Sequence, residues 1–130
     1  MALCWLMITP TTEIKATLSA AKELDYNNVI AVFQPFTFSR TALLKDDFIK
    51  ALSIADKVIL TPIMGSREKN TYGIKSEDLA AGLHDVCVVD GFENIADKIE
   101  EIARPGDLVI TMGGGDIYKA AHIIQGRHAE

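Results

Sequence analysis

The sequence predicts an α/β fold, a Rossmann-like open and mostly parallel sheet with helices on both faces. Apolar runs of strand length alternate with stretches whose apolar residues recur at helical spacing, and this alternation is typical of a parallel sheet covered by helices. The connections are short, so consecutive elements are expected to pack side by side. A length of 130 residues and a hydrophobic share of 48% suit one domain with its own core.

Four short apolar segments are the predicted strands. Each has strand length and is followed by a polar or glycine-containing stretch, and Pro35 ends the first of them. The segments are Val29 to Phe33, 57–63 (KVILTPI), 86–89 (VCVV) and 107–112 (DLVITM).

Helices are predicted between these strands. Residues 12–24 form the first, and Leu44, Phe48 and Leu52 mark a second with one buried stripe, capped by Thr37 or Ser39. The later helices are a short one that Ser76 caps, with Glu77 and Asp78 in its first turn, one marked by Ile95, Ile99 and Ile102 that ends at 104–106, and a last one through about Ile124.

Composition argues against several classes of partner. Thirteen Lys and Arg residues against 18 Asp and Glu give a net charge of −5, so the basic stripe that nucleic acids require is absent. The apolar opening 1–8 (MALCWLMI) is too short for a signal peptide or a membrane span. We therefore expect no nucleic-acid or membrane partner and a cytoplasmic protein, with Cys4 and Cys87 as free thiols.

Three segments follow predicted strands at the carboxyl edge of the sheet, where open α/β sheets bind ligands. They are 34–40 (QPFTFSR), 61–69 (TPIMGSREK) and 113–116 (GGGD). The functional site is expected among them.

The turn Gly113, Gly114, Gly115 and Asp116 is a candidate anion-binding turn, because glycines allow close backbone approach and helix N-terminal amides hold anions. It matches neither GxGxxG nor the phosphate loop GxxxxGK[ST]. The simpler interpretation is a tight turn with Asp116 as the N-cap of the last helix.

Arg40 is the second candidate, since its planar donors match two oxygens of a carboxylate or phosphate. The alternatives are a surface arginine paired with Asp46 or Asp47, and Ser39 acting only as a helix cap.

Other polar residues give weaker signals. Residues 67–69 (REK) are either a solvated charge cluster or part of a mobile loop over the sheet edge. His84, His122 and His128 have neither metal-ligand spacing nor a nucleophile nearby. We expect no metal site and no catalytic residue in the isolated domain.

Five segments resemble the C-terminal domain of the Mur ligase family, and within it the ligases that join L-alanine to UDP-N-acetylmuramate. The resemblance covers nearly everything from Thr12 onward. It rests on 12–18 (TEIKATL), 32–41 (VFQPFTFSRT), 46–48 (DDF), 66–69 (SREK) and 105–119 (PGDLVITMGGGDIYK).

The resemblance implies a function that needs other domains. In the family a first domain binds the UDP-sugar, a central domain carries the phosphate loop, and the third closes over ATP, magnesium and the amino acid. Arg40, with Ser39 beside it, matches the family motif whose arginine belongs to this closed site. Such a lid acts by positioning and charge stabilisation only when closed.

The sequence departs from the family in two places. Phe36 stands where the family often has histidine, and residues 5–11 (WLMITPT) stand where it has approximately DDYAHHP. Residues 6–12 (LMITPTT) can be written in codons that read Asp-Asp-Tyr-Ala-His-His when shifted by two bases. Residues 1–11 are therefore interpreted as an atypical leader from a shifted reading frame, disordered or loosely packed, with the family domain at 12–130; sequencing the locus decides.

A fragment with no function, or one that only docks on a partner chain, is one alternative, and two other functions also stay open. One is a stand-alone Rossmann-like module that binds a nucleotide or anion at the edge carrying Arg40 and Gly113–Asp116. The other is the same domain from the related ligase that recycles the cell-wall tripeptide, although 116–119 (DIYK) favours the alanine-adding enzymes.

Overall fold

A computed structural model describes residues 2–6, 11–65, 69–113 and 116–128. Its sheet has five strands in the order β1-β5-β2-β3-β4, and every neighbouring pair is parallel. The predicted open parallel sheet is confirmed. The strands are β1 (Ala2–Leu6), β2 (Val29–Gln34), β3 (Lys57–Leu60), β4 (Val86–Val88) and β5 (Leu108–Gly113).

Strand β1 is a correction to the sequence analysis, which placed no strand in residues 1–11. Its backbone pairs with β5 from Ala2 opposite Leu108 to Leu6 opposite Met112. Its apolar run has strand length, like the four predicted strands, but the sequence analysis interpreted residues 1–11 as an atypical leader. Residues 7–10, the centre of the proposed shifted-frame segment, lie outside the described residues.

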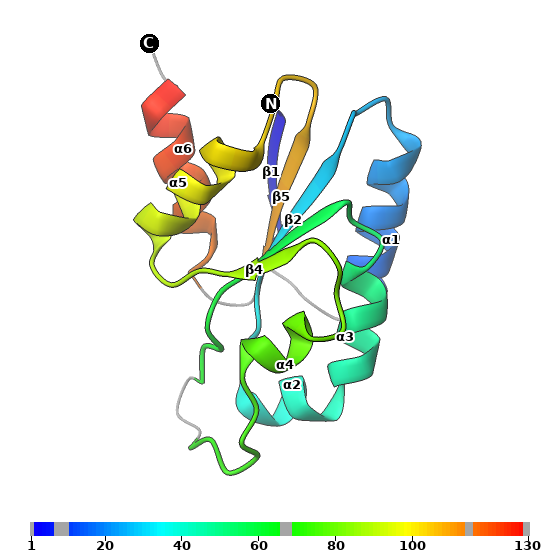
Figure 1. The fold of residues 1–130 in the computed structure, drawn as a ribbon, viewed down its shortest axis with the longest axis vertical. Helices are drawn as coiled ribbons and strands as arrows, with labels where there is room; N and C mark the ends of the chain where they lie inside the picture. The colour runs from blue at the N-terminus through cyan, green and yellow to red at the C-terminus, as the bar shows by residue number, and fades with distance from the viewer. Residues whose placement is uncertain (1, 7–10, 66–68, 114–115, 129–130) are drawn as a thin grey trace.

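The helices cover both faces of the sheet, as predicted. In Figure 1, α5 and α6 lie on one side of the strands, and α1, α3 and α4 lie on the other. None of the described helices is long and apolar enough to cross a membrane. The helices are α1 (Thr11–Glu23), α2 (Phe38–Leu43), α3 (Lys45–Leu52), α4 (Ser76–Ala80), α5 (Phe92–Ile102) and α6 (Tyr118–His128).

The central strand β2 is buried on both faces, and its residues alternate between two cores. Val29, Ala31 and Phe33 pack in the core beneath α1, α3 and α4, whereas Ile30 and Val32 pack in the core beneath α5 and α6. Such a continuous apolar run is expected where helices cover both faces of a parallel sheet.

Phe33 anchors the first of these cores. Its ring is fully buried, and its centroid lies 5.2 Å from that of Phe48 on α3. Replacing a core phenylalanine of this kind by alanine typically costs roughly 3–5 kcal/mol of stability. The aromatic pair therefore fixes α3 against β2, whose carboxyl end carries the candidate site.

The predicted helix that Thr37 or Ser39 caps and that carries Leu44, Phe48 and Leu52 starts as expected, but it is broken at Leu44. Leu44 has φ −106° and ψ 18°, outside helical values, and it separates α2 from α3. The side chain of Leu44 packs partly buried against the core, while neighbouring Leu43 is 83% exposed. Apolar spacing alone does not show such a break.

Ser76 is not the cap of α4 but its first residue. It is buried, and its hydroxyl donates to the carbonyl of Thr61 at the end of β3. The helix start is instead satisfied by Asp78, whose carboxylate accepts a hydrogen bond of 2.8 Å from the backbone N–H of Lys75. The predicted acidic first turn is present, but the serine serves to attach α4 to β3.

The turn between α5 and β5 occurs where 104–106 predicted it. The buried carboxylate of Asp107 accepts from the Arg104 N–H at 2.9 Å and from the Asn28 side chain at 3.2 Å. Gly106 takes a φ of 91°, which only glycine adopts readily. The turn is thus closed by a carboxylate that also attaches it to the start of β2.

Candidate functional site

The carboxyl edge of the sheet has a topological switch point between β2 and β5. Strand β2 continues into α2 and α3 on one face, and the neighbouring β5 continues into α6 on the other. Connections that diverge to opposite faces leave a crevice beyond the strand ends, and ligands of open α/β sheets bind there. Two of the predicted segments, 34–40 and 113–116, flank this point.

Thr37 begins the arginine-bearing helix. Its side chain accepts a 3.4 Å hydrogen bond from the backbone N–H of Arg40, so of the two predicted caps it is Thr37 that caps α2. Thr37 also has a φ of 63°, and it is the only non-glycine residue with positive φ in the described part of the chain. Strained backbone of this kind clusters at functional sites.

Arg40 itself is exposed on α2. Within the described ranges no ion pair joins it to Asp46 or Asp47, so the paired surface arginine considered above is not formed there. Ser39 is half-buried, one residue before Arg40, and takes part in interactions of its own. Among the described residues the Arg40 guanidinium has no ion-pair partner, so it is available to an anion.

The glycine turn after β5 is only partly described, because Gly114 and Gly115 lie outside the described residues. A Cβ on Gly113 would stand 3.0 Å from the Cβ of Gln34, so glycine here permits close packing of β5 on β2. Asp116 lies two residues before α6, and its carboxylate pairs with Lys119 at 3.7 Å. It is therefore not the residue next to the helix, as the capping interpretation required.

Gln34 is a residue of this edge that the sequence analysis did not single out. It is the last residue of β2, is only 6% exposed, and its Oε1 accepts from the backbone N–H of Ile117 at 3.1 Å. Nothing in the sequence distinguishes it from a surface glutamine, except that it stands at the end of a fully apolar strand.

The loop after β3 joins the same edge. The Met64 N–H donates to the Pro35 carbonyl at 2.9 Å, and the Thr37 N–H donates to the Met64 carbonyl at 2.8 Å. Half-buried Phe36, at the position of the family histidine, forms the bridge with Met64. The segments after β2 and β3 are thus connected through their backbones, while Ser66, Arg67 and Glu68 lie outside the described residues.

A hollow of about 230 Å³ opens beside these loops, between the ends of β3 and β4. Gln34 reaches its wall, and its other side is the start of α5, where Gly91 has a φ of 95°. It is lined by Gln34, Thr61, Pro62, Ile63, Met64, Asp90, Gly91, Phe92 and Ile95.

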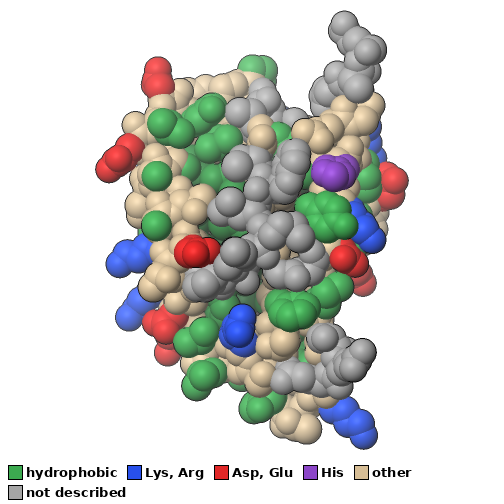
Figure 2. Space-filling model, turned by 180° about the vertical axis from the view of Figure 1, so that it is seen from behind, with side chains coloured by type: hydrophobic (Ala, Val, Ile, Leu, Met, Phe, Trp, Pro, Cys, Tyr) green, Lys and Arg blue, Asp and Glu red, His purple; other side chains and the backbone are tan. Residues whose placement is uncertain are grey.

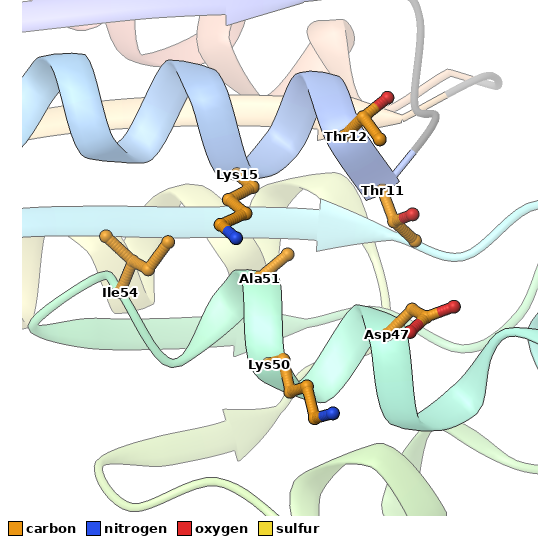
Figure 3. Close-up of a pocket in the computed structure, with 7 residues that line it drawn as sticks. All are labelled: Thr11, Thr12, Lys15, Asp47, Lys50, Ala51 and Ile54. Carbon is orange, nitrogen blue, oxygen red and sulfur yellow. The ribbon is translucent and has the colours of Figure 1, made fainter.

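A second hollow, of about 440 Å³, lies between α1 and α3 (Figure 3). Lys15 extends from α1 toward α3, and Lys50 and Asp47 come from α3. None of the predicted site residues lines this hollow, so it does not replace the carboxyl edge as the candidate site. Its lining comprises Thr11, Thr12, Lys15, Asp47, Lys50, Ala51 and Ile54.

The electrostatics of the surface are mixed. Figure 2 shows described acidic and basic side chains interspersed over one face, with no continuous patch of either sign among them. Of the histidines, His84 precedes β4 and His122 lies on α6 next to Tyr118, so the structure does not bring these two together. The side chain of His128 lies outside the described part.

Cys87 is a half-buried free thiol on β4. Burial raises its pKa; the charge of Lys98 opposes this effect, and the charges of Asp85 and Glu101 add smaller raising effects. A thiol with a raised pKa is a poor nucleophile at neutral pH, so it suits packing in the sheet rather than catalysis. The side chain of Cys4 is not described.

Residues 9–115 match the family model of the Mur ligase glutamate ligase domain. This range includes strands β2 to β5, the Arg40 helix and the glycines that follow β5. The chain belongs to the Mur ligase family.

Relatives of this Mur ligase domain are named UDP-N-acetylmuramate–L-alanine ligase. The UDP-N-acetylmuramate–L-alanine ligase of Caldicellulosiruptor saccharolyticus is 46% identical over 117 residues, which are 87% of this chain and 26% of the relative. That of Lachnospira eligens is 50% identical over 111 residues, 82% of this chain and 24% of the relative. The chain thus spans about a quarter of the length of these relatives.

Solved structures share the fold. A domain from a putative UDP-N-acetylmuramate:L-alanyl-γ-D-glutamyl-meso-diaminopimelate ligase of Haemophilus ducreyi gives a TM-score of 0.72 at 17% identity, over 96% of this chain and 89% of that one. The UDP-N-acetylmuramate–alanine ligase of Thermotoga maritima gives 0.65 at 21% identity, over 93% of this chain and 25% of that one. At these identities the likeness shows the Rossmann-like α/β fold of Mur ligase domains.

Proposed function

We propose that this chain acts as the closing C-terminal domain of an ATP-dependent UDP-N-acetylmuramate–L-alanine ligase of peptidoglycan precursor synthesis. The reaction converts ATP, UDP-N-acetylmuramate and L-alanine to ADP, phosphate and UDP-N-acetylmuramoyl-L-alanine. The observation that carries the proposal is the 42–50% identity to ligases of this name over 82–87% of this chain. Arg40, exposed on the helix that follows β2 and without an ion-pair partner among the described residues, supports it.

The proposed contribution of the chain is positional and electrostatic. The substrate carboxylate is phosphorylated by ATP, and the amine of L-alanine attacks the acyl phosphate; both steps concentrate negative charge on phosphate oxygens. Arg40 suits this charge, because its guanidinium is exposed and permanently cationic, and its backbone is held by the Thr37 cap. Ser39 and the turn 113–116 are proposed to lie beside the same ligands.

The remaining parts of the site are assigned to other domains. By resemblance, the UDP-sugar site belongs to the first domain, and ATP with magnesium to the phosphate loop of the central one. We assign no metal ligand and no independent catalysis to this chain, and we expect its site to be complete only when these domains close on it. A cytoplasmic location is part of the same proposal.

The test is a chimera in which the full chain replaces the matching C-terminal region of the Lachnospira eligens ligase. Formation of UDP-N-acetylmuramoyl-L-alanine from L-alanine, well above the level of the ligase truncated before that region, is the expected result. A chimera that folds but is no more active than the truncated ligase contradicts the proposal. A chimera that instead accepts the cell-wall tripeptide identifies the recycling ligase.

Titration of the isolated chain with Mg-ATP in a calorimeter distinguishes a closing domain from a stand-alone binding module. A closing domain holds only part of the site, so no binding in the micromolar range is expected. Micromolar binding that disappears with Arg40→Ala would establish an autonomous nucleotide-binding module instead.

The origin of residues 1–11 in a shifted reading frame is also a proposal. Sequencing the locus tests it, because codons that cannot spell Asp-Asp-Tyr-Ala-His-His in any frame rule it out.

A further inference from the structure

Gln34 stands between the two segments of the candidate site. It is the last residue of β2, its backbone lies opposite Gly113 at the end of β5, and its side chain is only 6% exposed. A glutamine buried at the end of an apolar strand loses its hydration, which is unfavourable unless its amide is hydrogen-bonded.

The hydrogen bond that Gln34 makes reaches across the crevice to the start of α6. Its Oε1 accepts from the Ile117 N–H at 3.1 Å, and Ile117 is 1% exposed. The Ile117 carbonyl accepts in turn from the Ala120 N–H at 3.0 Å, in the first turn of the helix. The direction of the carboxamide is fixed, because an N–H donor must face the oxygen and not the nitrogen of the amide.

Close packing around Gly113 leaves the hydrogen-bonded pair Gln34 and Ile117 little room to move. A Cβ at Gly113 would lie 3.0 Å from the Cγ2 of Ile117 and 3.1 Å from the carbonyl oxygen of Gln34. The end of β2, the end of β5 and the residue before α6 are thus in mutual contact. A lost hydrogen bond here leaves the buried Ile117 N–H without its partner.

On its other side Gln34 is continuous with the arginine segment. Pro35 fixes the next φ, its carbonyl accepts from Met64, and Thr37 caps the turn that carries Arg40. Five residues, Pro35 to Ser39, therefore separate Gln34 from Arg40, and Pro35 and Thr37 among them make backbone hydrogen bonds. The one carboxamide ties the segment 35–40 to Ile117 at the start of α6.

We propose that Gln34 is a positioning residue of the ligase site: its hydrogen bond with Ile117 fixes the segment that carries Arg40 relative to the start of α6, so that Arg40 meets the phosphates and the amino acid in one arrangement. The inference rests on the proposed function. Gln34 contacts the scaffold of the site rather than the reacting atoms, and it acts through the backbone N–H of Ile117.

The link itself is tested in the full chain, independently of ligase activity, by hydrogen–deuterium exchange of backbone amides. In Gln34→Met, which keeps the length of the side chain but has no acceptor, the Ile117 amide is expected to exchange at least about tenfold faster, while the amides of Ile30 and Val109 keep their rates. Gln34→Glu retains an acceptor oxygen in either protonation state and is expected to preserve slow exchange. Equal protection of Ile117 in the Met variant would overturn the inference.

The functional part is tested in the chimeric ligase by separating kcat from KM. Gln34→Met is expected to lower kcat by about tenfold to a hundredfold, since small misplacements at a site have effects of this size. The KM for UDP-N-acetylmuramate should stay within twofold of the wild-type value, and Gln34→Glu should recover the wild-type kcat. Ile99→Ala, in the core two turns along α5, is the control for lost stability alone and is expected to leave kcat within twofold.

The two experiments distinguish a failure of the proposed ligase function from a failure of the positioning role of Gln34. An inactive wild-type chimera contradicts the proposed function, and the exchange experiment still decides whether Gln34 holds Ile117. An active wild-type chimera whose kcat is unchanged by Gln34→Met, or lowered equally by Ile99→Ala, overturns the positioning role.

Discussion

The side chain of Thr37 accepts a 3.4 Å hydrogen bond from the backbone N–H of Arg40, and it does so from a φ of 63° that threonine rarely adopts. The capping hydrogen bond and the strained backbone thus belong to one residue, three positions before the arginine of the candidate site. The carbonyl of Thr37 also accepts from the Thr41 hydroxyl at 2.7 Å. The conformation is therefore held from both its side chain and its backbone.

Two substitutions of Thr37 distinguish the stability that comes from its capping hydrogen bond from the cost of its strained backbone. Thr37→Val keeps the branched side chain at positive φ but loses the acceptor, so we expect it to destabilise the chain by about 1 kcal/mol. Thr37→Gly removes a strain of about 1–3 kcal/mol and is a tolerated cap, so its stability should equal or exceed that of the wild type. Urea unfolding measures both, and a glycine variant less stable than the valine variant would contradict the strained conformation.

We predict that position 65 must be glycine, because the ring of Phe38 occupies the space that a side chain there would need. A Cβ at Gly65 would lie 2.2 Å from Cε2 of that ring, so Gly65→Ala must displace the first residue of α2. We expect a loss of about 1–3 kcal/mol, as in other overpacked sites, seen as a lower Tm.

Gly126 is the matched control for that glycine substitution. It lies inside α6, where an added Cβ meets nothing within 4 Å. Gly126→Ala should therefore stabilise the chain by about 0.8–1 kcal/mol through helix propensity. If both alanine variants shift Tm in the same direction, the packing of Phe38 on Gly65 is not as described.

Thr111 carries a buried hydroxyl that the fold does not use. It lies on β5, is fully buried, and its Oγ1 has no hydrogen-bond partner in the described structure. Thr111→Val replaces the hydroxyl by a methyl of similar shape, and an unsatisfied buried group costs about 1–3 kcal/mol. We expect a higher free energy of unfolding by chemical denaturation; a loss of stability of about 1 kcal/mol or more would show that the hydroxyl is bonded.

Asp56 makes stability depend on pH. Burial raises the pKa of its carboxyl, but hydrogen bonds from Lys22 and the Val29 N–H, both 2.7 Å, and the charge of Lys22 lower the pKa below its ordinary value of 3.8. A lowered folded-state pKa gives stability that is complete above the unfolded value and is lost as the pH falls through the folded one.

We therefore expect wild type to lose more stability than Asp56→Asn between about pH 5 and about pH 3. Urea unfolding at a series of pH values measures this difference. Parallel curves for the two proteins would show that the carboxylate has no net stabilising partner.

The parts of the fold that depend on periodicity could be predicted from the sequence. Strand β2 is a continuous apolar run because both of its faces are covered, and Ile95 and Ile99 define the inner face of α5. Leu44 could not be assigned to a helix break, since its spacing from Phe48 is helical and only its backbone angles are not. Strand β1 was missed because residues 1–11 depart from the family and were interpreted as an atypical leader, although their apolar run has strand length.

The candidate site was predictable only where a residue type carries its own chemistry. Arg40 attracted attention because guanidinium is a specific anion ligand. Gln34 did not, because its role comes from burial and from the Ile117 N–H on a segment 83 residues away in the sequence. Ser76 and Asp116 were both predicted as caps because their residue types favour that position. Ser76 instead bonds to Thr61, and Ile117, next to α6, bonds to Gln34; neither tertiary contact can be seen in the sequence.

The central claim is that Arg40 serves a ligase site completed by other domains, and the steady-state rate of the chimeric ligase tests it most directly. We predict that Arg40→Ala lowers kcat/KM by about a hundredfold or more, as expected for a group that stabilises transition-state charge. Arg40→Lys should restore only part of the lost kcat/KM. Lys50→Ala, which removes an equal charge from the exposed face of α3, should change kcat/KM less than twofold. An Arg40→Ala chimera that retains at least half of the wild-type kcat/KM would contradict the account.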